Sequence, residues 1–247
     1  MDTPFFLCYI FFMGQPKLFR IIDKAVFDYN LIEENDSILI GVSGGKDSTA
    51  LVHYLSHMLV QHREKFSFTA VHIATDISPP LSFELLSLFK SWNVEVKTIT
   101  ISVLDRLKEG RKMNCWWCST QRRTELNNFA IEHGFNKIAL GHHLDDMLET
   151  LLMNALSKGE LSTMPPRLTY EKYPVTIIRP LILCDEKTII AHSKEYQFSS
   201  LTCTCSYQDN SARKDARSKL NDLTGGSYNT KMKLVQALKN IKTEYLP

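Results

Sequence analysis

Hydrophobic positions along this chain switch between two periods. Apolar residues recur every three or four positions from Lys17 to Leu31, which predicts an amphipathic opening helix. The segment from Ser37 to Val42 is instead almost continuously apolar, as in a strand that is buried on both faces of a parallel sheet. The alternation then continues, with strands predicted at 68–73, 94–99 and 137–141 and helices around 51–59 and at 81–92, 119–133, 145–156 and 185–196.

Repeated strand–helix–strand units predict an α/β fold built on a doubly wound, mostly parallel sheet. The main domain is expected to cover residues 17–198, after an N-terminal extension at 1–16. Residues 199–247 are expected to form a small helical C-terminal segment, with helices at 211–220 and 231–238. Ligands of such sheets bind at the carboxyl ends of the strands, so functional residues should lie in the loops that follow them.

Composition changes this picture little. The 247 residues are 44% hydrophobic and 23% charged, which excludes disordered, collagen-like and coiled-coil chains. A net charge of +2 neither requires nor excludes a polyanionic partner. Six cysteines are too few for a disulfide-stapled secreted domain. The apolar run from Pro4 to Met13 is too short for a membrane span, and it lacks the basic flank of a signal peptide. The sequence therefore predicts a cytoplasmic protein with no membrane contact.

The strongest chemical signal is the segment Ser43–Ser48 (SGGKDS), between a predicted strand and a predicted helix. Its two glycines allow a tight turn that presents backbone N–H groups, its two serines add hydroxyl donors, and Lys46 adds a positive charge. Together with the positive end of the following helix, these groups suit a pyrophosphate. The segment departs from the P-loop of ordinary nucleotide triphosphatases, because no glycine lies five residues before Gly45 and Asp47 follows the lysine where Ser or Thr would stand.

A second polar stretch, Gly141–Asp146 (GHHLDD), follows a predicted strand and opens a predicted helix. It should therefore lie at the same edge of the sheet as the glycine turn. The neighbouring carboxylates Asp145 and Asp146, together with Asp47, suit Mg²⁺, which prefers oxygen ligands and bridges phosphates. The alternative is structural, because carboxylates at the start of a helix cap its N–H groups and interact favourably with its dipole.

Cys115 and Cys118 stand on either side of two tryptophans, just before a predicted helix. The positive end of that helix favours thiolates, which are the form that binds metals. A third cysteine, Cys203 or Cys205, would complete a set of three ligands, and a 4Fe–4S cluster held by three thiolates keeps one iron open. Two alternatives stay open: a closed zinc site of four thiolates, and a redox-active pair of the thioredoxin type, although thioredoxin-like proteins carry no phosphate-binding loop.

These segments, together with Met164–Pro166 and Ile178–Leu181, resemble the tRNA 2-thiocytidine synthetase (TtcA-type) family of the N-type ATP pyrophosphatase (PP-loop) superfamily. The resemblance runs from about Lys17 to Leu220. It implies a fold of the adenine nucleotide alpha hydrolase type and cleavage of ATP between the α- and β-phosphates. It also implies that a cytidine in the tRNA anticodon loop, at position 32, is adenylated at its C2 oxygen and then thiolated. The implied cofactors and partners are ATP, Mg²⁺, a 4Fe–4S cluster, a sulfur donor such as a cysteine desulfurase, and a second copy of the chain in a homodimer.

The residues and the resemblance together assign the candidate site. Catalytic roles fall to Lys46, Asp47, Asp145 and Asp146. The nucleotide is expected to contact Ser43, Gly44, Gly45, Lys46, Asp47, Ser48, Ala70, Gly141 and His142. The expected cluster ligands are Cys115, Cys118 and Cys205. Cys205 is preferred to Cys203 because its spacing to Arg213 is similar to that in related thiolases, although the family has two residues, not one, between its cysteines here.

Basic residues flank both cysteine segments, and an unpaired RNA base could lie on the ring of Trp116 or Trp117. The cations are Arg106, Lys108, Arg111, Lys112, Arg122, Arg123, Arg213, Lys214, Arg217 and Lys219. This clustering favours tRNA as the substrate. The alternatives are a tRNA thiouridine synthase or lysidine synthetase of the same superfamily, and a non-enzymatic nucleotide-binding, metal-binding, redox or RNA-binding module.

Overall fold

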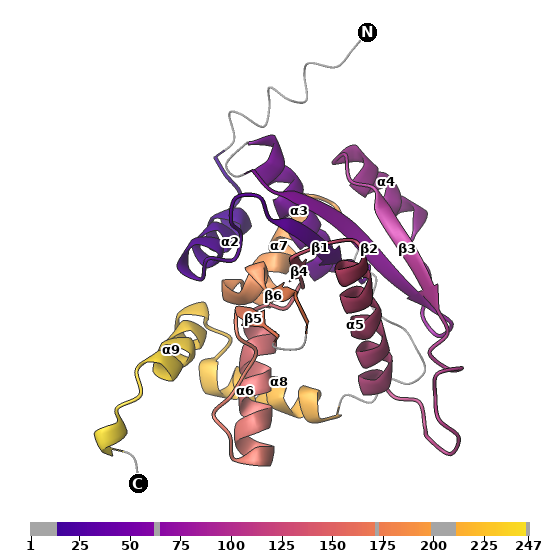
Figure 1. The fold of residues 1–247 in the computed structure, drawn as a ribbon. Coiled ribbons are helices and arrows are strands. Elements are labelled where there is room, and N and C mark those ends of the chain that lie inside the picture. The colour runs from indigo at the N-terminus through magenta and orange to yellow at the C-terminus, as the bar shows by residue number, and fades with distance from the viewer. Residues whose placement is uncertain (1–13, 62–64, 171–172, 199–210, 246–247) are drawn as a thin grey trace.

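The structure is a computed structural model that describes residues 14–61, 65–170, 173–198 and 211–245. Its centre is a six-stranded sheet of order β3-β2-β1-β4-β6-β5 (Figure 1). All neighbouring strands are parallel except β5, which pairs antiparallel with β6 at one edge. The strands are β1 (Ser37–Gly41), β2 (Ser67–Thr75), β3 (Val96–Ile101), β4 (Lys137–Ala139), β5 (Arg167–Thr169) and β6 (Thr176–Ile178).

Helices cover both faces of this sheet, as a doubly wound fold requires (Figure 1). One apolar cluster joins the sheet to α2, α3, α4 and α7, and a second joins its other face to α5. The helices are α2 (Lys17–Asp28), α3 (Lys46–Val60), α4 (Phe83–Ser91), α5 (Cys115–Glu132), α6 (Leu144–Lys158), α7 (Glu186–Glu195), α8 (Ser211–Thr224) and α9 (Tyr228–Lys239), with 3₁₀ turns η1 (Pro180–Leu183) and η2 (Thr243–Tyr245).

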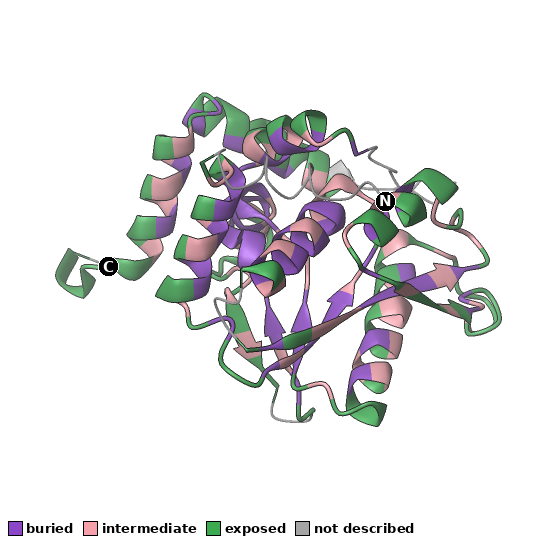
Figure 2. Cartoon of the chain, turned by 90° about the horizontal axis from the view of Figure 1, so that it is seen from above, coloured by how far each residue is buried: buried purple, intermediate pink, exposed green. Residues whose placement is uncertain are grey.

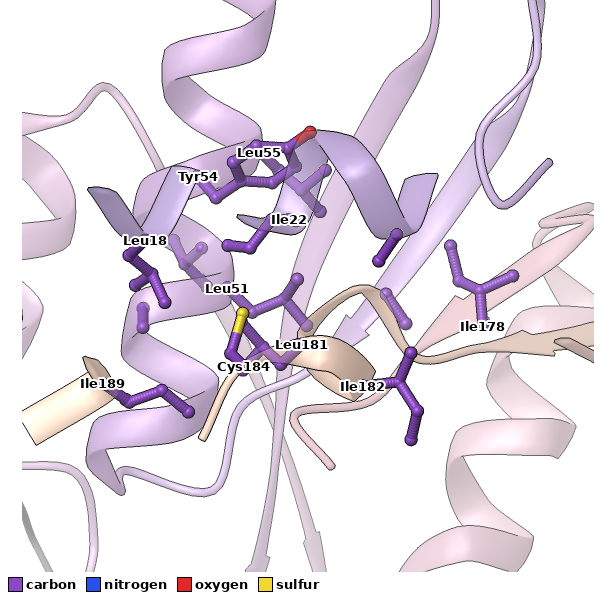
Figure 3. Close-up of a cluster of buried hydrophobic side chains, with 14 of the residues drawn as sticks. Leu18, Ile22, Leu51, Tyr54, Leu55, Ile178, Leu181, Ile182, Cys184 and Ile189 are labelled. Carbon is purple, nitrogen blue, oxygen red and sulfur yellow. The ribbon is translucent and has the colours of Figure 1, made fainter. Parts of the chain in front are cut away.

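The larger core forms where the opening helix packs on α3 and η1 (Figure 3). Ile22, Leu51 and Leu181 are completely buried in it, and each such side chain contributes about 1.5–3 kcal/mol through burial. The ring of Tyr54 is equally buried, and its hydroxyl donates to Asp23 at 2.8 Å, so the one polar atom of this side chain has a partner. In the view from above, the central strands are mostly buried and the outer faces of the helices are exposed (Figure 2).

The order in which the strands are added to the sheet changes direction between β1 and β4. From β1 it builds outward through β2 and β3, and it then returns to place β4 on the other side of β1. The loops after β1 and β4 therefore leave the sheet side by side at its carboxyl edge, where doubly wound folds bind ligands. These loops carry Ser43–Ser48 and Gly141–His143, so the fold brings together the two polar stretches that the sequence singled out.

Several element bounds differ from the sequence predictions by two to five residues, and two elements differ in a way that matters for the site or the sheet. Helix α5 begins at Cys115 instead of Ser119, because the Asn114 side chain caps it by accepting from the backbone N–H of Trp117 at 2.9 Å. The two cysteines thus lie inside the first turn of the helix and not before it. Strand β5 was not predicted, because it is short and follows a proline-containing turn.

The C-terminal helices share the main core. Leu220 of α8 and Val235 of α9 belong to the same buried cluster as the opening helix. Helices α8 and α9 both pack against α6, which begins at the sheet edge that carries the polar loops. The division of the chain at residue 199 stays a prediction. None of the described helices is both long and apolar enough to span a bilayer.

Candidate active site

The loop after β1 is held in shape by its own side chains. The hydroxyl oxygens of Ser43 and Ser48 lie 3.1 Å apart, and Ser48 also donates to the carbonyl oxygen of Gly45. Gly44 has a φ of +85°, a backbone conformation that side chains disfavour, which explains the glycine there. Gly45 is the N-cap of α3. The first N–H groups of a helix have no intrahelical acceptor, so the geometry of this glycine loop suits an anion.

Lys46 is held between two carboxylates. Its Nζ lies 3.0 Å from Oε1 of Glu186, at the start of α7, and 3.3 Å from Oδ2 of Asp47. Burial opposes the charged form, but the two carboxylates outweigh it and raise the pKa of Lys46 above its ordinary value. Lys46 is therefore a firmly protonated cation beside the glycine loop. Glu186 was not among the sequence-predicted site residues.

Asp47 carries a buried carboxylate oxygen with no hydrogen-bond partner. This atom, Oδ1, lies 4.0 Å from Nε2 of His143. Burial raises the pKa of Asp47, and the nearby His143 and Lys46 oppose that shift only in part. Buried carboxylate oxygens normally have a hydrogen-bond partner, so this unpartnered oxygen is available to a cation. It is the oxygen chemistry that Mg²⁺ prefers.

Gly141 allows the loop after β4 to touch the glycine loop. A Cβ at this position would lie 3.0 Å from the backbone nitrogen of Ser48 and 3.2 Å from the carbonyl carbon of Asp47. Because both neighbours are backbone atoms, a side chain could not be accommodated by a rotamer change. Gly141 therefore sets the separation between the two loops.

Asp146 forms a capping box at the start of α6. The backbone N–H of His143 donates to Asp146 at 3.1 Å, and the His143 ring accepts from the backbone of Asp146. The other oxygen of Asp146 accepts from Arg213 of α8 at 2.9 Å. The structural role that the sequence left open for this acidic pair is thus present for Asp146, with His143 as the N-cap.

Asp145 has a partner for each oxygen. Lys231 of α9 donates to Oδ1 at 2.6 Å, and the backbone N–H of Glu186 donates to Oδ2 at 2.8 Å. Although burial alone would raise it, the pKa of Asp145 is lowered by these two donors. Within the described ranges, no three His, Cys, Asp or Glu side chains gather as a metal site. Because both oxygens of Asp145 are paired within the protein and Oδ1 of Asp47 is not, Asp47 is better placed than Asp145 to bind Mg²⁺.

His142 lies among three arginines. Arg179 donates from Nε to Nδ1 of His142 at 3.3 Å and from its terminal nitrogen to the carbonyl oxygen of Pro165 at 2.6 Å. Arg123 of α5 and Arg213 of α8 are close enough to act on His142 electrostatically. Burial above all, aided by the arginines, lowers the pKa of His142 to about 4, so the ring is neutral near pH 7.

Arg179 lies in a segment that carries the family resemblance, but no role for it could be predicted from the sequence. Its position inside the apolar run that ends at Pro180 could have indicated a role, because an arginine is rarely buried unless it is paired. Arg123 and Arg179 thus add positive charge near His142 besides that of Lys46, whereas Arg213 is paired with Asp146.

The cysteine end of α5 lies at the same edge of the sheet. Cys115 is half-buried and Cys118 is buried one turn later. The Trp117 indole donates to the carbonyl oxygen of Val103, just beyond the end of β3, at 3.2 Å. Cys203 and Cys205 lie outside the described residues, so the assignment of the third ligand stays a prediction.

Ala70 lies in the interior of the sheet. It is completely buried in the middle of β2, where it pairs with Ile40 and Val96. A nucleotide at the carboxyl edge could reach the later residues of β2, but it has no surface of Ala70 to contact. His72, two residues further on, forms a 2.8 Å hydrogen bond with the carbonyl oxygen of Val42, next to the glycine loop.

Comparison with known proteins places these features in a family context. The family model of the PP-loop domain matches residues 16–223. The chain is 35% identical to tRNA-cytidine(32) 2-sulfurtransferase 1 of Francisella philomiragia over 94% of its own length and 92% of the relative's. It is 34% identical to tRNA-cytidine(32) 2-sulfurtransferase of Coxiella burnetii over the same shares. Among solved structures, it resembles the U34-tRNA thiolase NcsA from Methanococcus maripaludis, determined with its 4Fe–4S cluster, with a TM-score of 0.72, 20% identity, and coverage of 92% of this chain and 80% of that one.

Proposed function

This chain belongs to the PP-loop family and, within it, to the tRNA-cytidine(32) 2-sulfurtransferases, and from that premise we propose that it is an ATP-dependent enzyme that replaces the C2 oxygen of a cytidine in tRNA with sulfur. The observation that supports this reaction best is the arrangement at the sheet edge. A preformed anion loop with Lys46, an orphan carboxylate oxygen on Asp47 and a pair of cysteines on α5 all lie there.

The first step activates the base. The C2 oxygen of the cytidine attacks the α-phosphorus of ATP, a new P–O bond forms, and the bond to the β-phosphate breaks to release pyrophosphate. The glycine loop and Lys46 bind the departing pyrophosphate, and Asp47 would hold Mg²⁺, which would supply positive charge to the phosphates. Arg123 and Arg179, which act electrostatically on His142 of the neighbouring loop, would neutralise further negative charge.

The second step replaces the activated oxygen. Sulfide attacks C2, the C–O bond to AMP breaks, and AMP leaves with the oxygen, so no external oxidant or reductant is needed. Activation matters because the oxygen of a urea-like carbonyl is a poor leaving group, whereas AMP leaves readily. Cys115, Cys118 and Cys205 would hold a 4Fe–4S cluster, which would supply the chemistry that delivers the sulfur. A target base must reach both sites, which is easiest for an unpaired loop nucleotide.

The partners and setting follow from this chemistry as parts of the proposal. The substrate is tRNA, modified at the cytidine of position 32 as the names of the relatives indicate. A sulfur donor such as a cysteine desulfurase supplies the sulfur. The enzyme works in the cytoplasm, where thiols stay reduced, and the family resemblance favours a homodimer.

A tRNA thiouridine synthase is the second candidate. The fold is shared with the U34-tRNA thiolase NcsA, but at 20% identity that likeness concerns the fold alone. The relatives at 34–35% identity carry the cytidine in their names and favour the first candidate. The products of the reaction distinguish the two, because the thiolated nucleoside is a 2-thiocytidine in one case and a 2-thiouridine in the other.

Anaerobically reconstituted protein should form AMP, pyrophosphate and 2-thiocytidine in equal amounts from ATP, Mg²⁺, sulfide and unmodified tRNA. The replacement Asp47→Ala should abolish adenylation and leave the iron content unchanged. The replacement Cys115→Ala should remove the brown chromophore and spare nucleotide binding, so each variant is the control for the other.

Iron content in Cys205→Ala against Cys203→Ala identifies the third ligand. Absence of AMP release in the wild-type protein would favour a non-enzymatic nucleotide-binding module instead.

A further inference from the structure

We propose that the indole of Trp116 is a stacking platform for an unpaired base of the RNA substrate, next to the reaction site. The proposal rests on the proposed function for the identity of that substrate. It assigns a binding role to a residue of this chain that lies between the two cysteines of α5.

The two tryptophans of this segment differ in what their rings do. Trp117 is half-buried, and its indole N–H donates to the carbonyl oxygen of Val103, so it anchors α5 to the end of β3. Trp116, its immediate neighbour, has 69% of its surface exposed. What distinguishes Trp116 from other exposed aromatic residues is its position between the two predicted cluster ligands, Cys115 and Cys118, where its flat apolar face is accessible to a ligand.

Trp116 lies on the same face of α5 as a basic residue that acts on the site. Residues four and seven positions later, Thr120 and Arg123, share that face, because a helix returns to the same side at this spacing. Arg123 is close enough to His142 and Arg179 to act on both electrostatically. The exposed indole therefore lies on the same helix face as Arg123, about two turns closer to the start of α5.

The charges around Trp116 select the chemical class of its ligand. Residues 105–123 carry six Lys or Arg against two Asp or Glu. One of these cations, Arg106, is paired with Glu125 at 2.6 Å, whereas four are exposed: Lys108, Arg111, Lys112 and Arg123. A π-face surrounded by solvated cations matches a base flanked by phosphates, since bases stack on aromatic rings while Lys and Arg neutralise the backbone. Such stacking requires an unpaired base, so the ligand is a loop and not a duplex.

The test compares two labelled RNAs on the full-length, cluster-containing protein under anaerobic conditions. One is an anticodon stem–loop with unmodified cytidine, and the other is a fully paired duplex of the same length and charge. The variants are Trp116→Ala and Trp116→Phe, with Phe27→Ala of α2 as a matched control, because Phe27 is 83% exposed and lies outside the site. Iron content is measured for every variant so that cluster loss is detected separately.

Trp116→Ala should weaken binding of the stem–loop about tenfold to a hundredfold, the range that loss of one base–aromatic stack produces. Trp116→Phe should restore most of the affinity, and neither change should alter duplex binding or ATP binding. Phe27→Ala should bind like the wild type. Unchanged stem–loop affinity in Trp116→Ala, an equal loss for the duplex, or failure of the wild type to prefer the stem–loop would each overturn the proposal. Because binding is measured without turnover, a stack detected in a protein that forms no thiocytidine would refute the proposed reaction and leave the platform standing.

Discussion

Lys231 on α9 donates to Asp145 at the start of α6 over 2.6 Å, and the lysine side chain is only 4% exposed. The same aspartate accepts the backbone N–H of Glu186, whose side chain in turn pairs with Lys46 of the glycine loop. Three consecutive contacts thus connect the C-terminal helix to the residue that would bind pyrophosphate. The C-terminal segment is part of the support of the active site.

The first prediction concerns this buried ion pair. Lys231→Met should lower the free energy of unfolding by about 3 kcal/mol, because it leaves the Asp145 carboxylate buried beside an uncharged side chain. Urea denaturation at neutral pH measures the loss. The matched control is Lys24→Met, which removes the exposed pair with Asp28 and should cost less than about 1 kcal/mol. Similar losses in both variants would contradict the structural role assigned to Lys231.

The second prediction concerns the carboxylate that holds Lys46 in the absence of a ligand. Glu186→Gln removes one of the two negative charges next to Lys46, so pyrophosphate should bind several-fold more tightly. Lys46→Met should bind it more weakly than the wild type. Isothermal titration with pyrophosphate and Mg²⁺ measures both changes. Glu195→Gln, at the exposed far end of α7, should leave the affinity as it is. If Glu186→Gln weakened binding, the glutamate would have to contact the ligand directly.

The third prediction concerns the contact between the two loops. Gly141→Ala places a Cβ 3.0 Å from the backbone of Ser48, and the loops must move apart to relieve this contact. Overpacking of this kind costs about 1–3 kcal/mol of stability, and ATP affinity should fall because the anion site is distorted. Gly14→Ala, where a Cβ would meet nothing within 4 Å, serves as the control. ATP affinity equal to that of the wild type would show that the separation of the loops does not matter for binding.

The fourth prediction concerns acid stability and a cluster of rings between α3 and α7. His53 and His192 form a 3.1 Å hydrogen bond, and His57, Trp92 and Tyr196 complete the cluster. Burial, with repulsion from neighbouring histidines, lowers the pKa of His53 to about 3, and burial lowers that of His192 to about 4. Both rings stay neutral in the folded chain, whereas the unfolded chain protonates them near pH 6.5.

The free energy of unfolding should therefore fall as the pH drops from about 6.5 toward 4, because the unfolded state binds more protons there. Above pH 6.5, His53 and His192 should contribute nothing to the pH dependence of stability. His192→Phe should make the acid limb of the stability profile shallower, as measured by urea denaturation at several pH values. His133→Gln, at an exposed position on the surface, should leave the slope unchanged. An equally steep profile in His192→Phe would rule out the cluster as the source of the acid sensitivity.

Most of the fold could be predicted from sequence patterns that extend over only a few residues. The strand at Ser37–Gly41 and the glycine loop that follows could be predicted because a strand buried on both faces and a helix N-terminus both have patterns within a few residues. The parallel, doubly wound sheet followed from the repetition of such units. Strand β5 was not predicted because a three-residue segment next to a proline turn is too short for its hydrophobic pattern to distinguish a strand from a loop.

Long-range pairing limited the prediction of the site. The partners Asp145 and Lys231 lie 86 positions apart, and His142 and Arg179 lie 37 apart, and no local pattern connects such residues. Adjacent Asp145 and Asp146 suggested two metal ligands, yet the structure gives both carboxylates protein partners and leaves the unsatisfied oxygen on Asp47. Charge partners decide what a carboxylate does, and those partners are fixed only by the tertiary fold.

The central claim is that the oxygen removed from the RNA leaves on AMP. A tRNA whose target cytidine carries a heavy oxygen isotope at C2 tests it directly, in a single turnover with the anaerobically reconstituted protein, ATP, Mg²⁺ and sulfide. Mass spectrometry of the nucleotide product should find the heavy oxygen in the phosphate of AMP, in an amount equal to the 2-thiocytidine formed. AMP without the heavy isotope, formed alongside 2-thiocytidine, would mean that the C2 oxygen was never adenylated and would contradict the account.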